Sequence, residues 1–348
     1  MSNAATTSTT HALRLDHVSH SFGGKPALEN LSLIAPLHQV TVLLGPNGAG
    51  KTTAIRCITG AIAPDAGNVV TLGCDPSDEA GHVRSRIGVL SAKPALYDRL
   101  SGYDNLVYAA ELFGLEPRQT PDRIEFAAQM FGISSALSDL VGGYSTGMKT
   151  RLALARSILH DPELVLFDEP TSGLDPESSA AVLELIAAMP AAQRTVVMCT
   201  HLLSEAEGLA DHVVMMDGGT QVCEGTPAGL THRFFPRDIV TIEVELPEHL
   251  DALRHAQGVN DLCQTDATTV DVELRSFADT AGVVTYLVNH GAHITSVRQQ
   301  RPTLERLYFA ARSQSHPADL SAAILEEISL SSVATDEPTE SHPESIRP

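Results

Sequence analysis

A glycine-rich stretch near the N-terminus has the spacing G-x-x-x-x-G-K-[ST], which is typical of a phosphate-binding loop, or P-loop. Its residues are Gly45, Pro46, Asn47, Gly48, Ala49, Gly50, Lys51, Thr52 and Thr53. Glycines allow the backbone to curl so that successive N–H groups face one anion. Lys51 adds a positive charge for the β- and γ-phosphates, and the Thr52 hydroxyl can bind Mg²⁺. The pattern therefore predicts a nucleotide site.

A buried strand and a helix must hold this loop. The apolar run at residues 40–44 predicts the strand, and residues 53–58 predict the start of a helix whose N-terminal dipole also favours phosphate. A second apolar run, residues 164–167, ends at Asp168 and Glu169. Because ligands of open α/β sheets bind at the carboxyl ends of the strands, Asp168 is a candidate Mg²⁺ ligand. Glu169 is placed to polarise a water. The alternative, that both acids only cap a strand end, is disfavoured by the P-loop upstream.

Two further side chains, His201 and Phe22, each have two possible roles. A third apolar run, residues 195–200, ends at His201, which is either a satisfied strand-end histidine or a contact for a γ-phosphate. Phe22 lies in a turn between two alternating stretches that predict an antiparallel hairpin ahead of the P-loop strand. From spacing alone, its ring is equally a hydrophobic plug or a surface on which an adenine stacks.

Composition limits the partners. The 348 residues carry a net charge of −20, with a pI near 5.0. Such a surface repels nucleic-acid phosphates, so we expect no nucleic-acid partner. The five cysteines form no Cys-x-x-Cys pair, which favours reduced thiols over disulfides or a metal site. No run approaches the roughly 18 apolar residues of a membrane span, so we expect any transmembrane segments to belong to other subunits.

Taken in order, these motifs resemble the nucleotide-binding domain of ATP-binding-cassette (ABC) proteins, over roughly residues 12–226. The decisive stretch is YSTGMKTRL at residues 144–152, which resembles the family's signature loop, usually LSGGQ, and leads into a helix over 151–159. The sequence TSGLDP at residues 171–176 matches the family's D-loop, and His201 matches its switch histidine. The cassettes of drug, antibiotic and sodium exporters look similar in this region.

The resemblance implies an α/β fold, a P-loop NTPase cassette with a mixed sheet, an antiparallel β subdomain and a helical subdomain. In such proteins two cassettes meet head to tail, and each ATP lies between one P-loop and the other subunit's signature loop. The implied nucleotide contacts beyond the P-loop are Phe22, Ser145, Gly147 and Asp175, with Thr52 and Asp168 on Mg²⁺. Glu169 would be the general base and His201 the γ-phosphate contact. A homodimer or a paired cassette subunit is therefore expected.

One position departs from the family pattern. Residues 88–94 align with the Q-loop, and Ala92 stands where the family usually has glutamine. Alanine can neither bind Mg²⁺ nor hydrogen-bond an attacking water, although the Ser91 hydroxyl could compensate. The departure bears on metal coordination and on the coupling of hydrolysis to a membrane partner. The signature is also altered, with Tyr144 and Met148 in place of leucine and glutamine.

The chain after the cassette has a different pattern. We expect disorder at residues 1–11, the cassette at 12–230, an α+β accessory domain at 237–312 and a disordered acidic tail at 313–348. The order βαββαβ within residues 238–298 predicts a ferredoxin-like domain, with helices at 247–257 and 277–289 and a closing helix at 303–309. Residues 320–330 could form a short amphipathic helix. The accessory domain either supports dimerisation or regulation, or is a stabilising appendage.

The sequence therefore predicts an ATP-binding and ATP-hydrolysing subunit, with ATP and Mg²⁺ as cofactors. We expect it to power transport, as an exporter, through separate transmembrane permease subunits, from the cytoplasmic face of the cell membrane. The alternative is a soluble or regulatory ABC ATPase with little turnover and no coupling to transport, which the alanine at position 92 allows.

Overall fold

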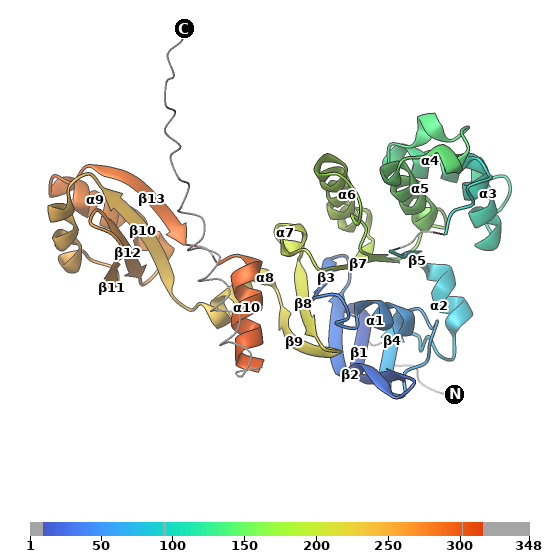
Figure 1. The fold of residues 1–348 in the computed structure, drawn as a ribbon, viewed down its shortest axis with the longest axis horizontal. Coiled ribbons are helices and arrows are strands. Elements are labelled where there is room, and N and C mark those ends of the chain that lie inside the picture. The colour runs from blue at the N-terminus through green and yellow to red at the C-terminus, as the bar shows by residue number, and fades with distance from the viewer. Residues whose placement is uncertain (1–9, 93–94, 301, 316–348) are drawn as a thin grey trace, which may run out of the picture.

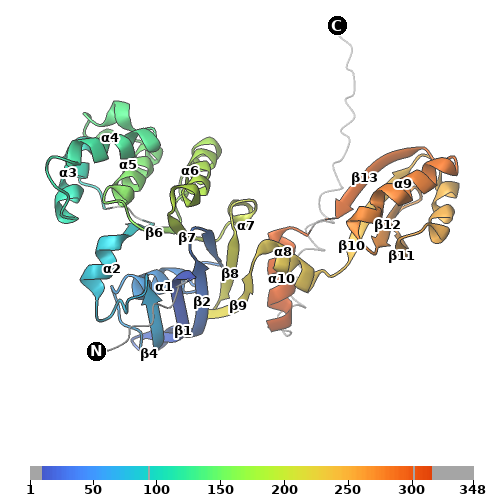
Figure 2. The same cartoon turned by 180° about the vertical axis from the view of Figure 1, so that it is seen from behind.

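The computed structural model describes residues 10–92, 95–300 and 302–315. Figure 1 shows a cassette with two sheets and a helical lobe, joined through α8 (Pro227–Phe234) to a separate unit built around a four-stranded sheet. The reverse view in Figure 2 shows the same separation. Among the described residues, no helix has both the length and the apolar character needed to cross a membrane. The predicted helix at 320–330 lies outside the described residues.

A six-stranded sheet forms the centre of the cassette. Its strands, in spatial order, are β5 (Ile87–Leu90), β6 (Leu164–Asp168), β7 (Thr195–Thr200), β3 (Val40–Leu44), β8 (His212–Asp217) and β9 (Thr220–Gly225). All pairs are parallel except β8 and β9. Every residue of β3, β6 and β7 is buried, because both faces of the sheet are covered. The predicted mixed sheet is therefore confirmed.

The two faces of this sheet pack into different cores. Val42 of β3 points into the core shared with the helical lobe, whereas its neighbour Leu43 points into the core shared with α1 (Lys51–Ile58). The second core is closed by a three-stranded antiparallel sheet in the order β2 (Lys25–Pro36), β1 (His11–Phe22) and β4 (Ala66–Thr71). Helix α1 is therefore fixed from both sides, and with it the loop that precedes it.

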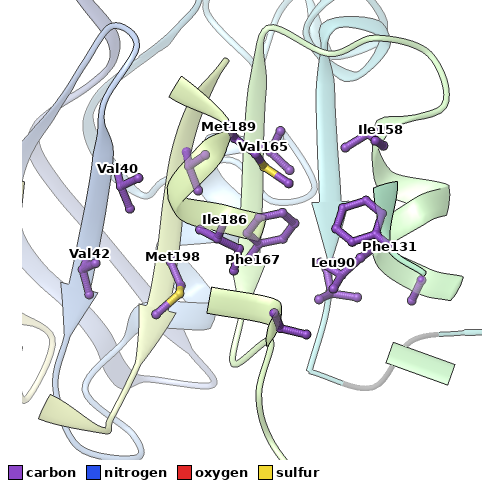
Figure 3. Packing of buried hydrophobic residues seen from close by; sticks show 14 of the residues in the cluster. Val40, Val42, Leu90, Phe131, Ile158, Val165, Phe167, Ile186, Met189 and Met198 are labelled. Atoms are coloured by element: carbon purple, nitrogen blue, oxygen red, sulfur yellow. The ribbon is translucent and has the colours of Figure 1, made fainter. Parts of the chain in front are cut away.

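The helical lobe covers the other face. It contains α3 (Gly102–Leu112), α4 (Thr120–Met130), the 3₁₀ turns η1 (Ser134–Ala136) and η2 (Val141–Gly143), and α5 (Thr146–Ile158). Figure 3 shows Phe131 of this lobe beside Leu90 and Ile158, and Ile186 of α6 (Pro176–Ala188) near Phe167 of β6. Helix α5 begins five residues before the predicted start at 151, because Ser145 caps it. Short elements α2 (Ala80–Arg86), η3 (Pro190–Ala192) and α7 (Leu203–Ala206) complete the cassette.

The separate unit has its own core. Its strands are β10 (Asp238–Val244), β11 (Val259–Gln264), β12 (Thr269–Leu274) and β13 (Ile294–Gln300), arranged antiparallel in the order β11-β12-β10-β13. Helix α9 (Thr280–Asn289), the turn η5 (Phe277–Asp279) and the segment η4 (Pro247–His255) accompany the sheet, and Leu253 and Leu287 share its core. Segment η4 is a 3₁₀ helix, whereas the sequence pattern predicted an ordinary helix over 247–257.

The last helix, α10 (Leu304–Ser315), packs on the cassette. Leu304, Leu307 and Tyr308 belong to the core cluster of the helical lobe and central sheet, and Arg312 Nε lies 3.0 Å from Asp217 Oδ2. The helix predicted to close the accessory domain therefore closes the cassette instead. It also continues past 313, where the sequence pattern predicted the disordered tail to begin.

Candidate active site

The loop between β3 and α1 has the backbone that its glycines permit. Gly48 and Gly50 have φ angles of 85° and 97°, in the left-handed region that side chains other than glycine rarely adopt. The Gly45 N–H donates to the Thr200 carbonyl at 3.3 Å, which ties the start of the loop to the end of β7. Helix α1 then begins at Lys51, so its N-terminal N–H groups open toward the loop. This arrangement suits an anion at the helix N-terminus.

Lys51 is held inside the loop. Its side chain is buried, and its Nζ donates to the carbonyl oxygens of Gly45, at 2.6 Å, and Pro46, at 3.0 Å. A phosphate entering the loop offers a charged acceptor in place of these neutral ones, and charge-assisted hydrogen bonds are the stronger kind. The lysine is therefore poised to exchange carbonyl partners for phosphate oxygens.

Thr52 and Asp168 meet at the carboxyl end of β6. Thr52 Oγ1 donates to Asp168 Oδ2 at 2.9 Å. Burial raises the pKa of the Asp168 carboxyl, the Thr52 hydrogen bond opposes that shift, and the neighbouring charge of Glu169 adds to it. A hydroxyl and a carboxylate oxygen are the hard ligands that Mg²⁺ prefers, so the two residues fit this ion. In the described part of the chain no group of three or more His, Cys, Asp or Glu could hold a metal ion.

Glu169 and His201 are in direct contact. His201 Nδ1 lies 3.0 Å from Glu169 Oε1, although the residues are 32 apart in sequence. Glu169 has a φ of 53°, which is uncommon outside glycine, and its N–H donates to the Cys199 carbonyl at 2.9 Å. Strained backbone of this kind gathers at functional sites, because the surrounding structure must stabilise it. Here the register of β6 and β7 holds Glu169 beside the residues that precede His201.

Glu169 and the P-loop line a cleft of about 290 Å³. Its lining comprises Phe22, Lys25, Pro26, Ala27, Asn47, Gly48, Gly50, Lys51, Thr52, Thr53 and Glu169. Phe22 is 46% exposed, and its ring meets that of His20 edge to face at 4.6 Å. Such exposure is unlike that of a hydrophobic plug and leaves a ring face available for stacking.

The predicted signature and D-loop residues lie outside this cleft. Ser145 caps α5, its hydroxyl accepting from the Met148 N–H at 3.2 Å, and Asp175 caps α6, accepting from the Ser178 N–H at 2.9 Å. That backbone hydrogen bond is the main cause of the lowered pKa of Asp175. A Cβ on Gly147 would lie 3.6 Å from Ser178 Oγ, so the two loops adjoin each other. A single chain therefore does not bring Ser145, Gly147 and Asp175 to its own P-loop.

A larger groove of about 880 Å³ adjoins the metal-site candidates, with Thr52 and Asp168 in its lining. Arg56, Arg84 and Arg156 line it together with the tyrosines and apolar side chains of α3 and the preceding loop. Within the described residues, none of these arginines has a carboxylate oxygen within 4.0 Å. Ser91 lines the same groove, and Ala92 beside it is exposed. The sequence pattern did not reveal this groove, because its arginines are far apart in the chain.

A family model described as ABC transporter matches residues 28–172. The chain is 34% identical over 300 residues to the daunorubicin resistance ATP-binding protein DrrA3 of Streptomyces coeruleorubidus, covering 85% of this chain and 94% of that protein. The chain belongs to the ABC transporter family of ATP-binding proteins. Family membership implies that this ABC protein binds ATP.

Two further similarities extend this result. The Nod factor export ATP-binding protein I of Rhizobium etli is 33% identical over 242 residues, which cover 70% of this ABC protein and 77% of the relative. A solved structure of an ATP binding subunit of an ABC transporter superposes with a TM-score of 0.59 at 28% identity, covering 64% of this chain and 93% of that one. The predicted P-loop ABC fold of the cassette is therefore confirmed.

Proposed function

We propose that this protein is the ATP-binding and ATP-hydrolysing subunit of an ABC transporter, which powers export through separate transmembrane subunits. The observation that carries the proposal is the convergence of Lys51, Thr52, Asp168, Glu169 and His201 at the carboxyl ends of adjacent strands. The names of the two relatives, daunorubicin resistance and Nod factor export, support the direction of transport.

The chain's own groups supply part of the machinery for phosphoryl transfer from ATP to water. The backbone N–H groups of the loop and the Lys51 ammonium bind the β- and γ-phosphates. Thr52 and Asp168 would hold Mg²⁺, which neutralises phosphate charge when it is bound. Glu169 orients the attacking water and accepts its proton. His201 Nδ1 steadies the Glu169 carboxylate and leaves Nε2 for the γ-phosphate.

Two copies, or one copy and a paired cassette subunit, would complete the site. Ser145, Gly147 and Asp175 lie away from their own cleft, so we propose that they contact the nucleotide of the opposing subunit. The Ser145 hydroxyl and the first N–H groups of α5 would then meet the γ-phosphate. ATP thereby links the subunits, and its hydrolysis releases them.

The arginine-lined groove is the proposed contact with the permease. In a chain with 43 acidic and 23 basic residues, three arginines without carboxylate partners at one groove favour an acidic partner segment. Tyr97 and Tyr108, exposed by 50% and 41%, would pack against its apolar side chains. This contact would place the protein on the cytoplasmic face of the membrane.

For the second unit we propose a ferredoxin-like fold. Its support is the antiparallel strand order β11-β12-β10-β13, which in chain order is the 2-3-1-4 arrangement of a βαββαβ unit. Its proposed role is dimer support or regulation. The proposed domain division keeps residues 12–230 as the cassette and assigns α10 to it as well.

The test is ATP turnover of the purified chain with Mg²⁺. We expect phosphate release, and a loss of at least about 100-fold in Glu169→Gln, because a positioned base contributes about that much. The variant should still form ATP-dependent dimers. The matched control is Glu207→Gln, since Glu207 is an exposed acid close to His201 in sequence. Turnover of the original chain no higher than that of Glu169→Gln would refute catalysis and favour the regulatory alternative. Co-purification with a multi-span membrane protein tests the coupling to transport.

A further inference from the structure

We infer that Glu205 is a positioning residue that holds the Glu169–His201 pair in place, an inference that rests on the proposed ATPase function. Glu205 lies in α7, a helix of four residues that packs against β3, β7 and α10. It is 7% exposed, and within the described part of the chain no Lys, Arg or His nitrogen lies within 4.0 Å of its carboxylate. A buried acid without a cation requires other hydrogen-bond donors.

Two threonines supply these donors. Thr171 Oγ1 donates to Glu205 Oε1, and Thr200 Oγ1 donates to Glu205 Oε2 at 2.6 Å. Both threonines are themselves buried, so water does not compete for these bonds. Hydrogen bonds to a carboxylate are shorter and stronger than those between neutral groups. Each oxygen of the Glu205 carboxylate thus accepts a hydrogen bond from a different segment of the chain.

The two threonines flank the proposed catalytic pair. Thr200 immediately precedes His201, and its hydroxyl also accepts from the Leu202 N–H at 3.0 Å, so both neighbours of His201 are fixed. Thr171 is two residues after Glu169, on the segment that leaves β6 for the D-loop. Glu205 therefore joins the segment after β6 to the end of β7 without lining the nucleotide cleft.

The Glu205 carboxylate fixes the relative positions of Glu169 and His201. The Glu169 carboxylate and the His201 ring come from these two segments and meet at 3.0 Å. Removing the Glu205 carboxylate removes the side-chain link between these segments, and a displacement of about 1 Å at a catalytic group can lower the rate by about 100-fold. Lys51 lies outside this clamp, and the P-loop meets Thr200 through a backbone bond, from the Gly45 N–H to the Thr200 carbonyl, which does not involve the Glu205 carboxylate. ATP binding should therefore change little. Loss of a residue that only supports the fold would not lower the turnover rate while leaving ATP binding unchanged.

Gln is the conservative replacement. Its carbonyl oxygen can accept from one threonine hydroxyl, and its amide can donate to the oxygen of the other, because a hydroxyl both donates and accepts. Alanine does neither and leaves two buried hydroxyls without their partner. Valine at 171 or 200 removes one hydroxyl while keeping the branched shape of the side chain.

The experiment compares Glu205→Ala, Glu205→Gln and the exposed control Glu207→Ala in the full chain. For Glu205→Ala we expect kcat to fall about 10- to 100-fold with the KM for ATP within about threefold. We expect Glu205→Gln and Glu207→Ala to keep kcat within about threefold of the original chain. If Glu205→Ala does not fold, Thr171→Val and Thr200→Val should each lower kcat with KM unchanged. A kcat that these variants leave unchanged, or a joint change of kcat and KM that Gln does not rescue, would overturn the inference.

A second measurement separates this inference from the proposed function. The His201 ring signal, assigned in histidine-labelled protein by its loss in His201→Asn, should move in Glu205→Ala and stay in place in Glu205→Gln. If the original chain hydrolyses no ATP, the proposed function fails and this signal alone decides the positioning role. A His201 signal unmoved by Glu205→Ala would overturn that role whatever the turnover.

Discussion

Two glycines of the P-loop provide a matched pair for a quantitative test. Gly48 and Gly50 both have positive φ angles, 85° and 97°. They differ in the space around them. A Cβ on Gly48 would have no atom within 4 Å, whereas a Cβ on Gly50 would lie 2.6 Å from the Ala27 carbonyl oxygen and 2.8 Å from Leu28 Cδ2. Alanine therefore has the same backbone cost at both positions, and at position 50 it has a steric cost as well.

The shared cost is that of the left-handed backbone, about 1–2 kcal/mol for a residue with a Cβ. Gly48→Ala should lower the free energy of unfolding by that amount. Gly50→Ala adds the cost of overpacking, about 1–3 kcal/mol, because the nearest atom belongs to the backbone of β2 and cannot rotate away. The expected total for Gly50→Ala is about 2–5 kcal/mol, and the difference between the variants is about 1–3 kcal/mol.

The assay is guanidinium unfolding without nucleotide, followed by far-ultraviolet circular dichroism, with the slope of each transition compared between variants. Omitting ATP is necessary, because both positions line the nucleotide cleft and ligand affinity would otherwise shift the midpoints. Equal destabilisation by Gly48→Ala and Gly50→Ala would refute the reasoning. A cost below about 1 kcal/mol for Gly50→Ala would do the same, since even the backbone contribution would then be missing.

Three other predictions concern the cassette. Burial raises the pKa of Asp168, so the folded chain binds that proton more tightly than the unfolded chain, and the resulting stability is lost as the pH rises through the folded pKa. Asp168→Asn should therefore stabilise the nucleotide-free protein by about 0.5–2 kcal/mol at pH 7–8, and by less at acid pH. Thermal melting that shows destabilisation of this variant at pH 8 would contradict the prediction. In denaturant unfolding, Leu307→Ala on α10 should destabilise the cassette by about 2–5 kcal/mol, whereas Phe309→Ala, at a side chain 46% exposed, should change the free energy of unfolding little. Equal effects of the two variants would mean that α10 does not belong to the cassette core. Phe22→Ala should weaken ATP binding by about 1–3 kcal/mol in a titration with a fluorescent ATP analogue, and Phe22→Tyr should not; unchanged affinity in the alanine variant would exclude stacking on this ring.

Much of the cassette could be predicted from the sequence because its signals are local. The P-loop pattern lies in consecutive residues, its glycines, Lys51 and Thr52, and continuous apolar runs such as residues 164–167 indicate strands that are covered on both faces. Helix ends were less predictable. Helix α5 starts at Thr146 because of the Ser145 cap, which the hydrophobic pattern does not encode.

The contacts between distant segments could not be predicted in this way. The sequence did not indicate a role for Glu205, since a single acid after a strand is most often exposed. Its partners Thr171 and Thr200 reach it only because β6 and β7 pair in parallel, with Asp168 opposite Cys199. The same holds for the position of α10, because its apolar residues alone do not indicate that they join the core of the cassette. Patterns along the chain indicate which residues are buried and which loop is the candidate phosphate site. Which buried residues meet depends on strand order and register, because these bring together atoms that the chain itself keeps far apart.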